Sequence, residues 1–153
     1  MGAVMCRQCD YSDLLKRSGV SLTVHRLRVL EVIGDSPCPL SHREIHRTLK
    51  RSRVVDRVTV YRILDLLVDK GVVQRISSGD RGFRYGLAPS SNHPSHHHFF
   101  CSVCGNMQCL DPGALPIDLQ ALQRSCASLI RNVEVRLDGI CGNCLENRGA
   151  KDN

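Results

Sequence analysis

The sequence predicts an α+β protein in which a helical N-terminal part ends in a β-hairpin and a smaller α/β part follows. Three observations predict this class. Apolar residues recur at helical spacing through the first half of the 153 residues, two short β-rich runs come next, and two Cys-x-x-Cys pairs bracket the second half. The polar stretch APSSNHP separates the parts, which favours a division into residues 1–87, a hinge at 88–94, and residues 95–153.

The first two helices are expected over Tyr11 to Ser18 and over Leu22 to Ile33. Gly19 and Ser21 interrupt the helical pattern between them, and Gly34 stands where helices commonly end. In the second segment the apolar side chains recur largely at helical spacing, so one face of that helix is expected to be buried.

Two further helices have recognisable N-terminal caps. Ser41 and Glu44 form the Ser-x-x-Glu capping box, in which each side chain satisfies a free backbone N–H of the first turn. A basic connector, KRSRVVDR, then leads to Asp56, which is expected to cap the helix VTVYRILDLLVDK before Gly71 ends it.

The segments VVQRI and FRYGL are β-rich and flank turn-forming residues 77–82, which predicts a hairpin. Helices followed by such a ribbon make a winged helix-turn-helix, in which the last helix enters the DNA major groove and the hairpin touches phosphates. Four residues near the start of that helix would then reach base edges: Arg57, Thr59, Tyr61 and Arg62. In the alternative interpretation the two arginines are only solvated and Tyr61 covers the core.

The basic charge lies in the first half of the chain. Residues 1–90 hold sixteen Lys and Arg against nine Asp and Glu, whereas residues 91–153 hold five against six. A basic part favours a phosphate backbone as partner, because each neutralised phosphate releases condensed counterions. Double-stranded DNA is therefore the expected partner, and the order of the elements supports it independently.

The second part is expected to form a small α/β unit. Strands are predicted over His97 to Val103, Asn106 to Leu110 and Val133 to Leu137, with a helix over Leu115 to Ile130. About sixty residues seldom bury enough surface to fold alone, so a bound metal, dimerisation or both are expected.

Four cysteines can supply that metal site. Cys101 and Cys104 form one Cys-x-x-Cys pair, and Cys141 and Cys144 form another after 36 intervening residues. Four thiolates in a tetrahedron make a closed structural zinc site, and the long spacer accommodates a helix and a strand. We expect a structural Zn2+ here, and its removal should unfold the second part.

A second group of metal-capable residues surrounds the first pair in the stretch HHHFFCSVCGNMQC. On a strand His96 and His98 share one face while His97 points away. Cys109 on the next strand can approach that face, and His93 lies on the hinge and can swing in. Imidazoles together with a thiolate suit zinc. The alternative is a solvated polar loop.

Other classes of protein are disfavoured. No His-x-Glu or His-Glu-x-x-His motif lies near this histidine cluster, so no general base stands beside an open metal, and an enzyme is not expected. No apolar run approaches the ~20 residues of a membrane span, and the N-terminus lacks the features of a signal peptide. A cytoplasmic location without membrane association is expected.

Together these residues resemble the ferric uptake regulator (Fur) family of bacterial metal-dependent repressors. The resemblance runs from about residue 10 to 145 and rests on Leu22-Thr23 with Arg26, VTVYRILDLLVDKGVV, FRYGL, His96-x-His98-x-x-Cys101-x-x-Cys104-Gly105 and Cys141-x-x-Cys144. It implies a homodimer with a winged-helix DNA-binding domain, a structural four-cysteine zinc and a regulatory metal site at the hinge. It also implies that AT-rich inverted repeats are bound when the regulatory metal is present.

Within the family the chain resembles the zinc uptake regulator (Zur) branch. Iron and peroxide sensors usually place carboxylates where this sequence has Gly86 and Cys109, and a thiolate in place of an oxygen ligand moves a site toward softer metals. Regulatory Zn2+ is therefore favoured over Fe2+, and its expected ligands are His93, His96, His98 and Cys109. The alternatives are an iron- or peroxide-responsive regulator and a DNA-binding module with only a structural zinc.

The remaining cysteines do not belong to either metal set. Cys6 and Cys9 form a third pair that the resemblance does not require, and we expect exposed thiols there, with a private metal or redox site as the alternative. Cys38 and Cys126 are interpreted as small apolar residues, although Cys38 follows the second helix near where some relatives of the family place a ligand.

Overall fold

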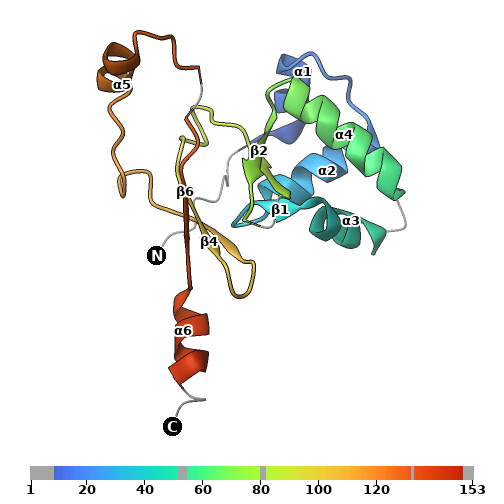
Figure 1. Cartoon of the computed structure of the whole chain (residues 1–153). Helices are drawn as coiled ribbons and strands as arrows, with labels where there is room; N and C mark the ends of the chain where they lie inside the picture. Colours follow the sequence, from blue (N-terminus) through green and yellow to red (C-terminus); the bar gives the residue numbers. More distant parts are fainter. Residues whose placement is uncertain (1–8, 52–54, 80–81, 132, 150–153) are drawn as a thin grey trace.

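The computed structural model describes residues 9–51, 55–79, 82–131 and 133–149 (Figure 1). We define its N-terminal part as the elements from α1 to β3, in which helices pack against a three-stranded sheet of order β1-β3-β2. These elements are α1 (Tyr11–Arg17), α2 (Val24–Gly34), β1 (Leu40–Ser41), α3 (His42–Lys50), α4 (Arg57–Asp69), β2 (Val73–Ser77) and β3 (Phe83–Leu87). No helix within the described ranges is long and apolar enough to span a membrane.

Side-chain caps determine where the helices of this part begin. Thr23 accepts a hydrogen bond from a backbone N–H of the first turn, so α2 starts at Val24 rather than at the expected Leu22. The predicted capping box is present before α3. Ser41 Oγ accepts from the Glu44 N–H at 3.3 Å, and Glu44 Oε2 accepts from the Ser41 N–H at 2.8 Å.

One hydrophobic core holds the N-terminal part together. Its helical members are Leu15, Val29, Leu30, Ile33, Ile45, Leu49, Val60, Ile63, Leu64 and Leu67. Tyr85 and Leu87 add buried side chains from β3. Burial of each such side chain contributes about 1.5–3 kcal/mol, so the core fixes α4 and the hairpin relative to α2 and the loop after it.

The C-terminal part, from β4 to α6, is built on a second three-stranded sheet of order β5-β4-β6. Its elements are β4 (His98–Cys101), β5 (Met107–Cys109), α5 (Leu119–Cys126), β6 (Arg136–Gly139) and α6 (Gly142–Gly149). β4 pairs antiparallel with β5 and parallel with β6. Figure 1 shows that this part is extended, with α5 and α6 at opposite ends of the sheet.

Several expected boundaries in the C-terminal part are wrong. The helix expected over Leu115 to Ile130 is confined to α5, because Asp118 caps its start and Ala127 follows its end in a left-handed conformation with φ of 47°. The strand expected over Val133 to Leu137 instead lies at 136–139, where it pairs with β4. α6 has no counterpart among the predicted elements.

The hairpin of the N-terminal part packs against the C-terminal sheet. Ile76 of β2 forms a small buried cluster with Phe100 and Met107. Glu134 Oε1 accepts hydrogen bonds from the Ser77 backbone N–H at 2.8 Å and from the Ser77 hydroxyl at 2.7 Å. These contacts hold the two parts in one arrangement and bring the hinge close to the loop after α2.

The cysteines outside the metal sets differ from expectation. Cys6 lies outside the described residues. Cys9 is half-buried against the core and is not a free thiol, so the expectation of an exposed thiol is wrong for this residue. Cys126 is exposed on α5, because this helix packs none of its residues into a core.

Candidate metal centres

Four sulfur atoms converge where the two Cys-x-x-Cys pairs meet. Cys101 ends β4, and Cys104 follows in the turn before β5. Cys141 and Cys144 lie at the start of α6, which the parallel pairing of β4 with β6 brings alongside. All four Sγ atoms lie within 4.8 Å of one another, and those of Cys104 and Cys141 are 3.8 Å apart. A tetrahedron with Zn–S bonds of about 2.3 Å has edges of about 3.8 Å, so the donors fit zinc.

Backbone N–H groups favour a thiolate in this cluster. The Cys141 N–H donates to Cys101 Sγ at 3.3 Å. Donation from the backbone of Cys104 and Cys141 lowers the pKa of Cys101 to about 6. Because the thiolate is the form that binds metal, Cys101 is prepared to ligate at neutral pH.

The second group of donors consists of His96, His98 and Cys109. In the sheet, His98 of β4 lies directly opposite Cys109 of β5. One ligand atom from each of the three residues lies within 4.8 Å of the others, and the ring centroids of His96 and His98 are 4.8 Å apart. His97 turns away as predicted, with Nε2 2.9 Å from the Leu115 carbonyl oxygen.

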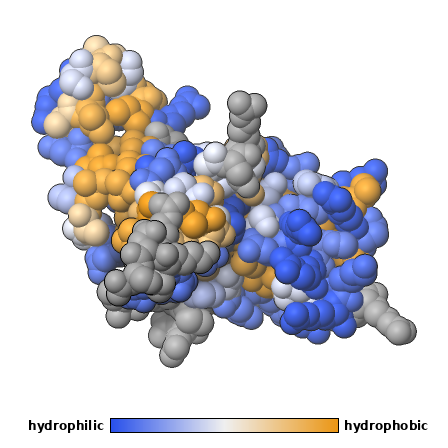
Figure 2. Space-filling model, turned by 60° about the horizontal axis from the view of Figure 1, so that its bottom comes forward, coloured by the Kyte–Doolittle hydropathy of each residue, from blue (hydrophilic) through white to orange (hydrophobic). Residues whose placement is uncertain are grey.

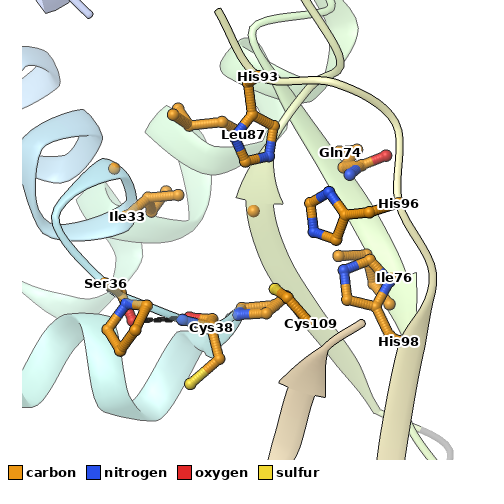
Figure 3. Close-up of a pocket in the computed structure, with 14 residues that line it drawn as sticks. Ile33, Ser36, Cys38, Gln74, Ile76, Leu87, His93, His96, His98 and Cys109 are labelled. Atoms are coloured by element: carbon orange, nitrogen blue, oxygen red, sulfur yellow. Dashed lines mark hydrogen bonds between the residues drawn. The ribbon is translucent and has the colours of Figure 1, made fainter. Parts of the chain in front are cut away.

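These three side chains line a cavity between the two parts of the molecule (Figure 3). Its walls also carry His93, from the segment before β4, and Cys38, from the loop after α2. The interior of about 20 Å³ has room for a single ion or water molecule. Two lining atoms, His93 Nδ1 and His98 Nε2, are buried without a hydrogen-bond partner among the described residues. Such atoms cost free energy until a ligand satisfies them.

Cys38 is absent from the ligand set expected from the sequence, where it is interpreted as a small apolar residue, although it follows the second helix near where some relatives place a ligand. It is half-buried on the cavity wall between Pro37 and Pro39. Its carbonyl accepts a hydrogen bond from Ser36 Oγ at 2.6 Å, which fixes the loop. Burial raises the pKa of Cys38, and the pKa of Cys109 is raised by burial and further by electrostatic repulsion between the two thiolates when both ionise. The available signal was a thiol in a proline-flanked loop directly after a helix of the core.

Burial favours the neutral imidazoles of His98 and His93 and the protonated thiol of Cys109. It lowers the pKa of His98 to about 4, with a further contribution from His96, and it also lowers the pKa of His93. Neutral imidazole is the ligating form. Burial acts in the opposite direction on the thiol and raises the pKa of Cys109 to about 11, so Cys109 must release a proton in order to ligate.

The residues expected to contact DNA lie on the first two turns of α4. Arg57, Tyr61 and Arg62 are exposed. Thr59 is half-buried, and its hydroxyl donates to Asp56 Oδ2 at 2.5 Å, while its backbone N–H donates to Asp56 Oδ1 at 3.0 Å. Asp56 is thus the predicted cap of α4, and the Thr59 side chain supports that cap.

Comparison with known proteins identifies the family. Residues 17–121 match the ferric uptake regulator family. The chain belongs to this family. It is similar to the ferric uptake regulation protein of Bacillus subtilis, with 29% identity over 132 residues that cover 85% of this chain and 89% of the relative. The ferric uptake regulation protein of Bordetella parapertussis is 30% identical, over 91% of this chain and 99% of the relative.

Solved structures of ferric uptake regulators and their relatives share the fold. The Vibrio cholerae ferric uptake regulator gives a TM-score of 0.71 at 25% identity, covering 86% of this chain and 100% of that one. A zinc uptake regulator complexed with zinc and DNA gives 0.63 at 22% identity, covering 93% and 99%. The family membership makes this protein a metal-responsive, DNA-binding transcription regulator and not an enzyme.

Proposed function

We propose that this ferric uptake regulator family protein is a zinc-responsive repressor that binds inverted-repeat DNA when its second metal site is filled. The observation that carries the proposal is the cavity in which His96, His98 and Cys109 converge, with a buried and unpartnered nitrogen of His93 beside them. The four-cysteine cluster would hold a separate, structural zinc. Zn2+ in the cavity would act as a Lewis acid that accepts lone pairs from the donor nitrogen and sulfur atoms.

The donors of the cavity favour zinc over iron. Among the described residues that line it there is no carboxylate. Gly86 forms part of the wall, where a Cβ would lie 3.4 Å from Ile76 Cδ1, and the polar lining side chains beside the proposed donors and Cys38 are the neutral ones of Ser36 and Gln74. Oxygen ligands suit magnesium, calcium and manganese, whereas thiolate and imidazole suit zinc. Three imidazoles with the Cys109 thiolate make a four-donor zinc set.

Coupling to DNA binding follows from the position of the cavity between the two parts. Cys38 lies on the wall formed by the N-terminal part, Cys109 lies on β5, and His93 lies in the connecting segment. We infer a DNA-binding domain at 1–87, a hinge at 88–94 and a metal-binding domain at 95–153. Donors that are drawn to one centre hold the hinge closed, which selects one placement of α4. A metal that bound equally well to both placements of α4 would not change their relative populations.

We infer that a second copy of the chain covers the apolar surface of the C-terminal part. α5 buries none of its residues. The exposed leucines of this region are Leu115, Leu119, Leu122, Leu129 and Leu137. Figure 2 shows hydrophobic residues gathered at the end of the molecule that α5 forms. Contiguous exposed apolar surface of this kind marks an interaction site, and a homodimer would present two winged helices to the two halves of an inverted repeat.

Within each winged helix, α4 would enter the major groove. Arg57, Tyr61 and Arg62 project from its exposed side, and Thr59 lies between them on the first turns. The β2–β3 hairpin would contact the flanking phosphates, because it follows α4 directly and carries the exposed Arg75. Arg84 of the same hairpin is not available for this role, since its guanidinium binds Glu44 and the Gly105 carbonyl oxygen.

Metal analysis combined with duplex titration tests this function. Full-length protein loaded with zinc should contain two zinc ions per chain, and a duplex enriched from a random-sequence pool should bind it tightly. Mild chelation should remove one zinc and release the duplex, and added Zn2+ should restore binding at a lower free concentration than Fe2+, Mn2+ or Ni2+. One tight zinc per chain with metal-independent binding would instead support a module with only structural zinc, and recovery at lower Fe2+ would support an iron sensor.

A further inference from the structure

An aromatic stack at the start of α4 takes no part in either metal site. His42, the first residue of α3, lies with its ring parallel to that of Tyr61 on α4, with centroids 3.4 Å apart and an interplanar angle of 9°. His46, one turn later on α3, lies parallel to His42 at 6.3 Å. The Arg57 guanidinium carbon lies 6.0 Å from the centroid of the Tyr61 ring.

A hydrogen bond gives this stack a fixed orientation. His42 Nε2 lies 3.3 Å from the carbonyl oxygen of Arg57. Because a carbonyl oxygen only accepts, Nε2 must carry the proton. Arg57 is the first residue of α4, and Tyr61 lies one turn later. A single imidazole of α3 therefore contacts two successive turns of α4, one by a hydrogen bond and one by stacking.

The two stacked rings differ in their access to a duplex. His42 is 7% exposed and Tyr61 is 42% exposed, so only the tyrosine can touch DNA. Burial lowers the pKa of His42, and the charges of Arg57 and His46 lower it further. The imidazole is thus uncharged at neutral pH, which does not suit a phosphate contact.

We propose that His42 is a positioning residue for sequence recognition, which pins the Tyr61 ring so that its edge meets one base pair in the major groove. The inference rests on the proposed role of α4 in DNA contact. Without a stacked partner an exposed aromatic side chain samples several rotamers, and this freedom is lost on binding. With one face covered by His42, Tyr61 does not insert between bases, and its accessible edge suits an apolar contact such as the thymine methyl group.

Affinity measurements on two duplexes test the positioning role. Full-length zinc-loaded protein is titrated with a duplex enriched from a random-sequence pool by the wild-type protein, and with a scrambled duplex of equal composition. Loss of a fixed aromatic pair in His42→Ala should weaken binding to the enriched duplex about two- to tenfold. Binding to the scrambled duplex, which depends on phosphate contacts, should be unchanged. His42→Phe should restore the affinity because it keeps the stack.

Two control variants make the outcome decisive. His46→Ala, on the same helix at the longer ring distance, should bind like wild type. In a Tyr61→Ala background His42→Ala should have no further effect, and a persisting loss would overturn the proposal. An equal loss on both duplexes, or no loss at all, would also overturn it.

A second measurement needs no DNA and separates this inference from the proposed function. In protein with ring-labelled tyrosine, the NMR signal that disappears in Tyr61→Phe belongs to Tyr61. His42→Ala should shift this signal, because the ring current of the imidazole is removed, and His42→Phe should retain a ring-current shift. If the chain binds no duplex, the proposed function is wrong. The chemical shift of Tyr61 still tests whether His42 fixes the position of the Tyr61 ring. An unchanged Tyr61 signal in a folded His42→Ala variant would contradict it.

Discussion

The four-cysteine cluster and the histidine-thiol cavity hold similar donors but differ in where those donors come from. All four sulfurs of the cluster belong to the C-terminal part, within the turn after β4 and the start of α6. The cavity instead collects His93 from the connecting segment, His98 and Cys109 from the C-terminal sheet, and Cys38 from the loop after α2. A metal in the first site would stabilise only one part, whereas we propose that a metal in the second site changes how the two parts sit.

The two sites also differ in their state without metal. In the cluster, backbone N–H groups lower the pKa of Cys101 to about 6, whereas hydrogen bonding with Cys141 and burial raise the pKa of Cys144 to about 12, so the cluster holds both a thiolate and a protonated thiol at neutral pH. In the cavity, burial raises the pKa of Cys109 to about 11 and leaves nitrogen atoms of His93 and His98 unpartnered. Metal binding would therefore release protons at both sites, but the cluster already presents the thiolate of Cys101, whereas in the cavity burial opposes ionisation of Cys109.

The largest effect is expected from removing one sulfur of the cluster. Cys101→Ser should remove the structural zinc, whose apparent binding free energy in small domains is about 10–16 kcal/mol, and should unfold the C-terminal part. Zinc content and limited proteolysis measure both consequences. Cys126→Ser, at an exposed cysteine of α5, is the matched control and should retain full zinc content. If the Cys101→Ser chain is folded, resists proteolysis and contains as much zinc as wild type, the four-cysteine cluster is not a structural zinc site.

Removing a donor of the cavity should affect DNA binding without unfolding the chain. Cys109→Ser should retain one zinc per chain and lose the other, and duplex affinity should fall about 5- to 150-fold, the range typical of allosteric coupling. Gln108→Ala, on the exposed face of the same strand, is the control. If Cys109→Ser responds to zinc like wild type in a duplex titration, the cavity is not the regulatory site.

This difference between the sites also explains what sequence reasoning could predict of the fold. The capping box at Ser41 and the cap at Asp56 are local signals, and both are present. The position of β6 depends on parallel pairing with a strand far away in the chain, where His98 lies opposite Arg136, and no local pattern gives that register. The helical pattern of the sequence continues past α5. The helix α5 itself buries none of its residues and ends before Ala127, because no packing stabilises a longer helix in the described part of the chain.

For the two sites, ligands close together in the sequence could be predicted, whereas ligands that only tertiary packing brings together could not. The Cys-x-x-Cys pairs indicated the cluster directly. His96, His98 and Cys109 also lie together, but strand alternation is not the cause, because β4 begins only at His98 and the pairing of His98 with Cys109 brings the donors together. Cys38 could not be found in this way, since the packing of a whole helical core brings its loop to the cavity.

A pH dependence should test whether the Cys109 thiolate binds the second zinc. Metal binding at the cavity requires the Cys109 thiol, with a pKa raised to about 11, to lose its proton, whereas His98, with a pKa of about 4, is already neutral above pH 6. Affinity of the second zinc should therefore rise about tenfold per pH unit between pH 6 and 8. Competition with a chelator of known protonation measures this slope. A second zinc whose affinity is independent of pH would exclude thiolate ligation by Cys109.

The smallest expected effect concerns the contact that holds the two parts together beside the cavity. Glu134 accepts two hydrogen bonds from Ser77 of β2, so Glu134→Ala should favour separation of the parts and weaken the second zinc only about two- to fivefold, because the contact is solvent-exposed. Calorimetric titration of the second zinc measures the change, and the structural zinc should be unaffected. Glu146→Ala, on exposed α6, is the control for loss of one negative charge. Of the two glutamates, Glu134 contacts the N-terminal part through Ser77, whereas Glu146 is the charge control. Equal weakening in both variants would therefore mean that net charge, and not the closed arrangement of the two parts, sets the zinc affinity of the cavity.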